Sequence, residues 1–313
     1  LRDIITIKSR GWNVYVNGEQ YDDFNTNIMG SKYINCTTVD EVKAIEPNYQ
    51  TVDVIDGTWN ESLRDLENSN TSNTIQGGMF YNCDALQTFN SDLSSLTNGI
   101  GMFYECTSLN TINCKDLNSL TKGITMFAYT NISSFSIDLP SLNYAGGMFY
   151  KCTALNSFTS ELNSITTGDY MFCGCTELNS FNITMNGLVN GTGMFLNCSN
   201  LSIFNSDLNN LEIGTTMFYE CRSLSSLDIV SPGLTSLTTG TRMFYYCENL
   251  ENFNYNLSNL EKGEGMFMYC HKLANFESDL SSLKNCYRMF GCCYNMTAFS
   301  ADLTNLEDGE EMF

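Results

Sequence analysis

Two stretches decide the fold: residues 102–124 read MFYECTSLNTINCKDLNSLTKGI, and residues 266–288 read MFMYCHKLANFESDLSSLKNCYR. Both open on Met-Phe, carry cysteine and leucine at the same offsets, and continue to Asp-Leu. Regular self-similarity of this kind is the signature of a repeat architecture. The Met-Phe pairs start at intervals of 22 to 26 residues, at Met79, Met102, Met126, Met148, Met171, Met194, Met217, Met243, Met266, Met289 and Met312.

The repeat unit predicts its own local structure. From Leu86 to Leu93, apolar and polar residues come to alternate, which predicts a strand with one face inward. A corner glycine such as Gly99 or Gly123 then suits a positive φ or a close approach of two backbones. Met-Phe-Tyr-x-Cys is too short for a full helix, and we expect one helical turn with methionine, phenylalanine and cysteine pointing inward.

One such unit cannot bury its apolar face alone, but stacked units can. We therefore predict a repeat solenoid of about ten coils, mainly β with short helical turns. The predicted solenoid covers residues 58–313, with a degenerate first repeat at 58–78, regular repeats at 79–313 and an open C-terminal end. We expect that the natural chain continues there, or that this end packs on another subunit.

Residues 1–57 differ from the repeats and predict a small α+β cap, or a separate attachment region. Residues 14–19 read as a strand entering an Asn-Gly hairpin turn. Residues 38–41 form a capping box before a short helix that Pro47 ends. Residues 50–55 predict another strand.

Composition excludes several functions. Lys and Arg number 15 against 35 Asp and Glu, a formal net charge of −20, which argues against nucleic-acid binding because phosphate neutralisation needs a basic face. The same balance argues against docking on anionic lipid, and no apolar run is long enough to span a membrane. His271 is the only histidine, in a position that predicts a solvated turn residue. We identify no catalytic or cofactor-binding residue and expect no enzyme.

Fourteen cysteines would normally suggest a disulfide framework. Nine of them share one position of the repeat, which favours a ladder of small buried thiols over disulfides. The five others, Cys36, Cys114, Cys173, Cys286 and Cys292, are scattered, and their redox state stays open. The nine ladder positions are Cys83, Cys106, Cys152, Cys175, Cys198, Cys221, Cys247, Cys270 and Cys293.

Tyrosines supply the candidate ligand-binding residues. Tyrosine has a polar end and a flat apolar face, which suits recognition of protein or sugar. The alternative is that these rings simply cover the turn below them. The candidates follow Met-Phe directly and are Tyr81, Tyr104, Tyr150, Tyr219 and Tyr245, with Tyr129, Tyr246 and Tyr269 at the next position.

A column of acidic residues recurs before the leucine pair of each unit. Stacked like charges repel, and Ca²⁺ bridging could offset that cost, with Asp92, Asp116, Asp207 and Asp279 as candidate ligands. The favoured interpretation is local: each carboxylate accepts hydrogen bonds from backbone amides two or three residues on. The column is completed by Asp138, Glu161 and Asp302, with Thr184 and Asn256 in other units.

Leu-x-x-Phe followed by Gly-x-x-Met-Phe-x-x-Cys on a 23-residue period resembles the BspA-like leucine-rich repeats, in the Met-Phe variety of bacterial surface proteins. The resemblance covers about residues 79–313. It implies a parallel-sheet solenoid on a cell surface, used for adhesion or protein recognition, with no catalytic or cofactor residue. One departure is an inward strand position that holds Ser91, Ser160, Ser206 and Ser278, whose hydroxyls need partners if buried.

The resemblance leads us to expect a non-catalytic extracellular binding module on a bacterial cell surface, recognising a host protein or glycan. Two alternatives remain. One is a virion component, such as a phage fibre or receptor-binding protein built on the same repeat. The other is a passive structural spacer.

Overall fold

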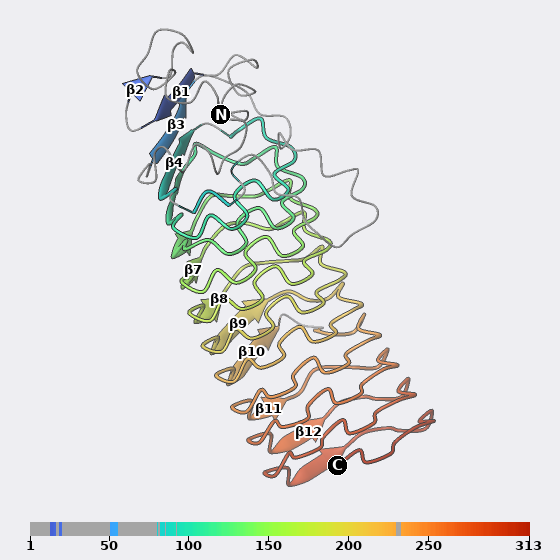
Figure 1. The fold of residues 1–313 in the computed structure, drawn as a ribbon. Helices are drawn as coiled ribbons and strands as arrows, with labels where there is room; N and C mark the ends of the chain where they lie inside the picture. Colours follow the sequence, from blue (N-terminus) through green and yellow to red (C-terminus); the bar gives the residue numbers. More distant parts are fainter. Residues whose placement is uncertain are drawn as a thin grey trace, which may run out of the picture.

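The computed structural model describes residues 13–16, 19–20, 51–55 and 80–313, the last range without residues 81, 85, 92 and 230–232. Its coils stack into a gently twisted rod that ends at the C-terminus (Figure 1). Strands lie along one side, and the Met-Phe segments form turns on another. The described part contains no helix. The protein is thus a parallel β-solenoid, as the period predicts.

Each coil contributes one short strand of two to four residues, at the position that alternation predicts. Pairing is parallel and keeps the repeat in register, so Phe181 lies opposite Phe204 and Phe253 opposite Phe276. The strands are β4 (Thr88–Ser91), β5 (Thr111–Asn113), β6 (Ser134–Phe135), β7 (Ser157–Phe158), β8 (Ser180–Phe181), β9 (Ile203–Ser206), β10 (Ser226–Ile229), β11 (Asn252–Phe253), β12 (Asn275–Glu277) and β13 (Ala298–Ser300).

A second ladder runs along another side of the described coils, which we call the bridge face. It consists of single parallel bridges, from Asn98 with Lys122 to Asn285 with Asp308. Nine such bridges link ten coils. Backbone groups are therefore paired between neighbours on two sides, which satisfies them within the stack.

The Met-Phe segment differs from the expected helical turn. Met102, Tyr104 and Cys106 donate their N–H groups to carbonyls three residues earlier, while Phe103 and Glu105 donate to the next coil. A positive φ at Glu105 and at the residue before Met102 interrupts helical geometry. The result is a run of overlapping β-turns, because a positive φ at the third position is what type II turns require.

The side-chain prediction for this segment is confirmed. In one coil, Met217, Phe218, Cys221 and Leu224 are all fully buried. Phe218 stacks on Phe195 of the preceding coil at 5.6 Å between ring centroids. The strand phenylalanines form a second column that meets the first edge to face. The Met-Phe rings form an unbroken column from Phe80 to Phe313, while Ile112 and Leu227 replace phenylalanine in the strand column.

The corner glycines owe their place to a close approach, and not to positive φ. A Cβ added to Gly214 would lie 2.8 Å from Sδ of Met243 in the next coil, and φ at Gly214 is not positive. Ala145 and Cys286 occupy the same position in other coils and are fully buried. The positive φ falls instead on the residue before each methionine, for example Gly193 and Thr216.

Some of the inward serine hydroxyls have hydrogen-bond partners in the described chain, and one does not. Oγ of Ser206 donates to the carbonyl of Ile183 at 2.6 Å, and Ser278 bonds to Tyr255 O at 2.8 Å. Ser160 is fully buried, and its hydroxyl has no hydrogen-bond partner within the described chain. The side chain of Ser91 lies outside the described residues.

The longest repeat, which starts at Met217, holds an insertion, Ser231-Pro232-Gly233, whose sequence predicts a surface turn. Of this insertion the structure describes only Gly233. In the coil that follows it, Tyr255 takes the serine position. Tyr255 Oη donates to the carbonyl of Leu227 at 2.5 Å and accepts from the N–H of Ile229 at 3.4 Å. A side chain therefore makes backbone contacts here, between β10 and β11, which belong to different sheets.

Three strands precede the repeats: β1 (Asn13–Val16), β2 (Glu19–Gln20) and β3 (Thr51–Ile55). β1 and β2 form the predicted antiparallel hairpin, with Val16 opposite Glu19. β3 matches the strand predicted at residues 50–55; it pairs with β1 and, in parallel, with β4. The predicted helix after residue 38 and the degenerate repeat at 58–78 lie outside the described residues, so the division at residue 57 remains a prediction.

Candidate functional site

Three of the tyrosines form a patch on the turn face, the side of the rod made by the Met-Phe turns. We call Tyr104, Tyr129 and Tyr150 the N-terminal tyrosine patch. Their rings meet edge to face, at 5.6 Å from Tyr104 to Tyr129 and 5.4 Å from Tyr129 to Tyr150. Nζ of Lys151 lies 5.5 Å from the centroids of both Tyr129 and Tyr150. Tyr81 lies outside the described residues.

A larger patch covers four successive coils nearer the C-terminus. Tyr219 stacks on Tyr245 at 4.8 Å, and Tyr246 stacks on Tyr269 at 4.3 Å. An edge contact of 4.9 Å between Tyr245 and Tyr246 joins the two pairs. At the C-terminal end of the patch, His271 stacks on Tyr294 at 5.4 Å between ring centroids. We call these six residues the C-terminal tyrosine patch: Tyr219, Tyr245, Tyr246, Tyr269, His271 and Tyr294.

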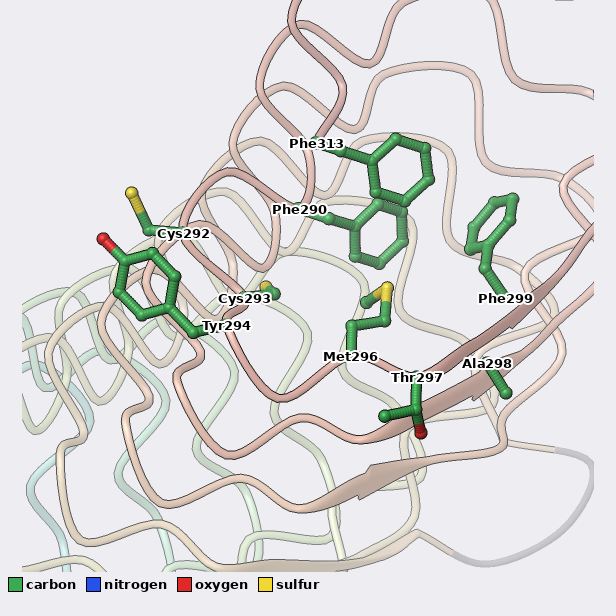
Figure 2. Close-up of a pocket in the computed structure, with 9 residues that line it drawn as sticks. All are labelled: Phe290, Cys292, Cys293, Tyr294, Met296, Thr297, Ala298, Phe299 and Phe313. Carbon is green, nitrogen blue, oxygen red and sulfur yellow. The ribbon is translucent and has the colours of Figure 1, made fainter.

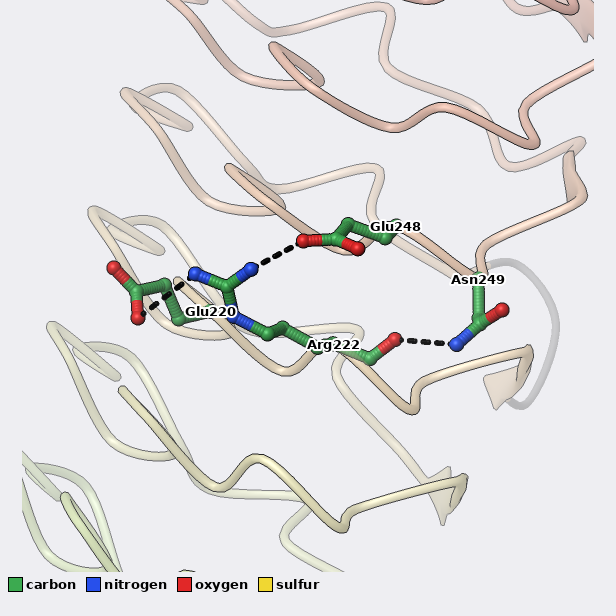
Figure 3. A network of polar contacts seen from close by, with 4 residues as sticks. All are labelled: Glu220, Arg222, Glu248 and Asn249. Atoms are coloured by element: carbon green, nitrogen blue, oxygen red, sulfur yellow. Dashed lines mark hydrogen bonds and ion pairs between the residues drawn. The ribbon is translucent and has the colours of Figure 1, made fainter.

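A charged network adjoins this second patch (Figure 3). The guanidinium of Arg222 contacts the carboxylates of both Glu220 and Glu248. It also lies 5.0 Å from the ring centroid of Tyr246, on which it makes a cation–π contact. Nδ2 of Asn249 donates to the carbonyl of Arg222 at 2.8 Å. Arg222 therefore connects two coils and neutralises the acidic side chains beside the tyrosines.

Two coils separate the patches and carry no aromatic residue at these positions. There the corresponding side chains are Cys173, Leu196 and Asn197, together with Gly174. The predicted column of tyrosines is thus divided into two clusters. Sequence reasoning missed the parts of Arg222 and Tyr294, because each occupies a neighbouring column and meets the tyrosines of another coil only when coils stack. It also missed Lys151, which replaces tyrosine in the second tyrosine column and lies near the rings of Tyr129 and Tyr150.

His271 was predicted to be a solvated turn residue. It is only partly buried, yet it stacks on Tyr294 and meets the Tyr269 ring at 6.1 Å edge to face. The contact between His271 and Tyr294 of the next coil could not be inferred from the position of His271 in the repeat. Tyr294 itself is 76% exposed and keeps an open ring face.

Three phenol groups of the patches, those of Tyr150, Tyr219 and Tyr245, stay protonated at neutral pH because their pKa values are raised. Burial raises the pKa of Tyr150, Tyr219 and Tyr245 above the usual value for tyrosine. Nearby cations, Lys151 beside Tyr150 and Arg242 beside Tyr219 and Tyr245, offset only part of that rise. The hydroxyls are therefore available as hydrogen-bond donors as well as acceptors.

Several residues of the acidic column serve the turns, as the favoured interpretation predicts, whereas Asp138 accepts from the N–H of Glu161 in the next coil at 3.2 Å. Asp116, Asp207 and Asp279 each accept a hydrogen bond from the backbone N–H two residues on, at 3.3, 2.8 and 2.8 Å. Asn256 makes the same bond at 2.8 Å. The hydrogen bonds from Ser281 lower the pKa of Asp279. Asp92 lies outside the described residues.

Among the described residues, no group of three or more histidine, cysteine or acidic side chains could hold a metal ion. An amide can replace the carboxylate at the Asn256 position without losing the turn bond, which fits a structural role for the column. The calcium hypothesis is not tested by this geometry, since neighbouring coils could still supply single ligands to an ion.

The cysteine ladder is confirmed over the described coils. Eight of the nine ladder thiols are buried, Cys293 being partly so. From Cys152 to Cys293, they are free thiols whose Sγ–H groups donate to the phenylalanine carbonyl of the preceding coil. Thr130 takes the slot in one coil and bonds to its own Phe127 carbonyl at 2.8 Å.

Residues of the last described coils line a recess of about 500 Å³ (Figure 2). Phe290, Met296 and Phe299 line it, with Phe313 lying 5.6 Å from Phe290 and 5.1 Å from Phe299 between ring centroids. Phe313 is 65% exposed. The recess is therefore lined largely by apolar side chains, and the open C-terminal end itself stays a prediction.

The repeat unit also matches a known protein family. The family model described as "BspA type Leucine rich repeat region" matches in six copies, over residues 58–145, 123–239 and 212–313. The chain belongs to this family. A search among characterised proteins found no match. The repeated Met-Phe/Cys unit and the solenoid are thus those of BspA-type repeats.

Solved structures with a similar chain course are also leucine-rich repeat proteins. One from Eubacterium ventriosum has a TM-score of 0.46 at 16% identity, covering 84% of this chain and 89% of that chain. One from Bacteroides ovatus has a TM-score of 0.34 at 17% identity, covering 82% and 86%. A leucine-rich cell surface protein from Faecalibacterium prausnitzii has a TM-score of 0.34 at 16% identity, covering 80% and 90%.

In the part of the chain that the structure describes, no helix is long and apolar enough to cross a membrane.

Proposed function

We propose that this BspA-type repeat protein is a non-catalytic binding module of a bacterial cell surface, which recognises a host protein or glycan through its turn face. The observation that supports it is the clustering of tyrosines into two patches on one face of the solenoid. Aromatic residues and arginine are enriched at binding interfaces. The Arg222 contact with Tyr246 adds both kinds of residue to one patch.

The side chains that could do chemistry are used structurally, which supports a role without catalysis. Ladder thiols such as Cys152 and Cys175 are buried, and burial raises their pKa, so the nucleophilic thiolate is disfavoured. His271 stacks on Tyr294 and meets Tyr269 edge to face. Asp207 and Asp279 accept backbone hydrogen bonds.

The test is a binding screen with matched tyrosine variants. The purified chain is applied to a glycan array and to an array of host extracellular proteins, and hits are measured by surface plasmon resonance. We expect Tyr104→Ala or Tyr219→Ala to weaken binding at least tenfold. Tyr144→Ala is the control, because Tyr144 is 48% exposed but lies on the bridge face. Circular-dichroism melting curves check that each variant is folded.

Unchanged binding by both patch variants would reject the turn face as the recognition surface. Tyr219→Phe separates the hydroxyl from the ring, since it preserves stacking on Tyr245. A chain that binds nothing in either array would favour the structural-spacer alternative. The virion alternative has no observation in its favour beyond the repeat itself.

We further propose that the module works without a bound metal. Melting temperatures in millimolar Ca²⁺ and in chelator should agree, because the acidic column already has amide donors. A sharp rise with Ca²⁺ would instead assign Asp116, Asp207 and Asp279 to calcium binding.

A further inference from the structure

We propose that the C-terminal tyrosine patch binds a protein segment that presents a carboxylate, received by Arg242. This inference rests on the proposed function and names its partner class. It comes from three observations on the patch: which ring faces are covered, which charges are already paired, and where Arg242 lies.

The ring faces of this patch are largely occupied by one another. Tyr246 lies between the stacked ring of Tyr269 at 4.3 Å and the guanidinium of Arg222 at 5.0 Å. Tyr245 is stacked by Tyr219 on one side and met by the edge of Tyr269 at 5.4 Å. A sugar that packs on an aromatic face finds these faces taken. Ring edges, which carry partial positive charge, and hydroxyl groups remain for a partner.

Three carboxylates at or near this patch are already paired with arginine. Glu220 and Glu248 both bind Arg222, and Glu311 binds Arg288 at 2.5 Å. By contrast, no carboxylate of the described chain lies within ion-pair distance of Arg242. Arg242 is thus an exposed arginine without a carboxylate partner in the described chain, whereas Arg222 and Arg288 are both paired.

Arg242 lies beside Tyr245, in the part of the patch nearer to Tyr219. Arg242 and Tyr245 both lie beside Gly265. A Cβ added to Gly265 would be 3.4 Å from Cγ of Arg242 and 3.7 Å from Cδ2 of Tyr245. The charge of Arg242 acts on both Tyr219 and Tyr245, where it partly offsets the effect of burial on the phenol pKa. Arginine forms bidentate hydrogen bonds with carboxylates, and neighbouring hydroxyls can donate to the same group.

The net charge of −20 does not prevent this contact. Charges more than about 8 to 10 Å apart are largely screened at physiological ionic strength, so the local set of groups decides the bound state. The overall charge acts on the rate of encounter, which should rise with added salt for an acidic partner. A basic partner would show the opposite salt dependence.

The experiment uses the whole chain on an array of matched peptides that differ only in having Glu, Gln or Lys at one position, printed beside a glycan array. We expect Glu peptides to be retained at least tenfold better than their Gln counterparts. Arg242→Gln should abolish that preference, and Arg242→Lys should restore part of it. Lys262→Gln is the matched control, because Lys262 is an exposed cation on the bridge face.

Preference for Lys peptides, or a Glu preference that survives Arg242→Gln, would overturn the inference. Retention of glycans that is lost on Tyr294→Ala would also overturn it, while leaving the turn face as a recognition surface. If Tyr104→Ala, Tyr219→Ala and Arg242→Gln all bind as the unmodified chain does, this inference and the proposed function fail together.

Discussion

Sγ of Cys221 lies 3.1 Å from the carbonyl oxygen of Phe195, 26 residues earlier and one coil away. The N–H of Cys198 donates to the same carbonyl at 3.0 Å. The phenylalanine carbonyl therefore accepts one bond within its coil and one from the next. The cysteine of each unit acts as a small hydrophobic residue that also closes a hydrogen bond between coils.

The first prediction concerns Cys221→Ala. The variant loses the bond to Phe195 and leaves a small cavity, so unfolding should become easier by about 1–3 kcal/mol. Urea titration followed by circular dichroism measures it. Cys292→Ala, at a partly exposed thiol outside the ladder, should change stability by less than about 0.5 kcal/mol. Equal effects of the two substitutions would contradict the proposed role of the ladder.

The second prediction concerns alkaline pH. Burial raises the pKa of Cys152, Cys173 and Cys286 to about 11, whereas an unfolded thiol titrates near about 8.5. Above that lower value, the unfolded chain loses protons that the folded chain keeps, so stability falls as pH rises. The melting temperature should be level between about pH 6 and 8 and fall from about pH 9 to 11.

Cys152→Ala serves as the control for this pH dependence. The variant starts less stable but should show a shallower decline above about pH 9, because it has one fewer raised thiol. Tyrosine ionisation affects both proteins equally and cancels in the comparison. Parallel declines would show that buried thiols are not responsible.

The third prediction concerns the corner glycines. Gly214→Ala places a Cβ 2.8 Å from Sδ of Met243, which must move within a filled core, at a cost of about 1–3 kcal/mol. Gly146→Ala is the control, because its nearest atom would be 3.7 Å away and its φ is not positive. Differential scanning calorimetry should show a lower melting temperature for the first variant alone. Combining Gly214→Ala with Met243→Leu should recover part of the loss.

The fourth prediction concerns Tyr255. Tyr255→Phe keeps the ring against Phe253 but removes the hydroxyl that contacts Leu227 and Ile229. We expect a loss of about 1–2 kcal/mol, since a partly buried carbonyl and N–H are left without this partner. Tyr144→Phe, at an exposed ring, should be neutral. Faster amide exchange at Ile229 in the Tyr255 variant would place the effect beside the insertion.

The fifth prediction concerns Thr216, a β-branched residue with a φ of 52°. Thr216→Gly removes that strain and should stabilise the chain by up to about 1 kcal/mol, after allowing for the flexibility of glycine when unfolded. Thr215→Gly, where φ is not positive, should destabilise by about 0.5–1 kcal/mol. Chemical denaturation midpoints of the two variants should therefore move in opposite directions.

Much of the fold is predictable because each unit repeats one chemical pattern. Alternation predicts that Phe204 and Phe253 point inward, and the shared offset predicts the same for Cys198 and Cys221. The turn role of Asp207 is predicted from the residues that follow it. The prediction of a helical turn in the Met-Phe segment was wrong. The residues with positive φ in this segment depend on backbone hydrogen bonds to the next coil. The two explanations offered for Gly214 could not be separated without the position of Met243.

The sequence by itself determined the solenoid, its period and the chemistry of each column, because apolar residues at a fixed spacing can be buried only when like units stack. The tertiary structure alone decided which columns meet. Tyr246 touches Tyr269 and Arg222, and Tyr255 reaches Leu227, through the register between coils and the length of one insertion. Such contacts join residues about one repeat apart, and small shifts in turn geometry decide whether their side chains touch.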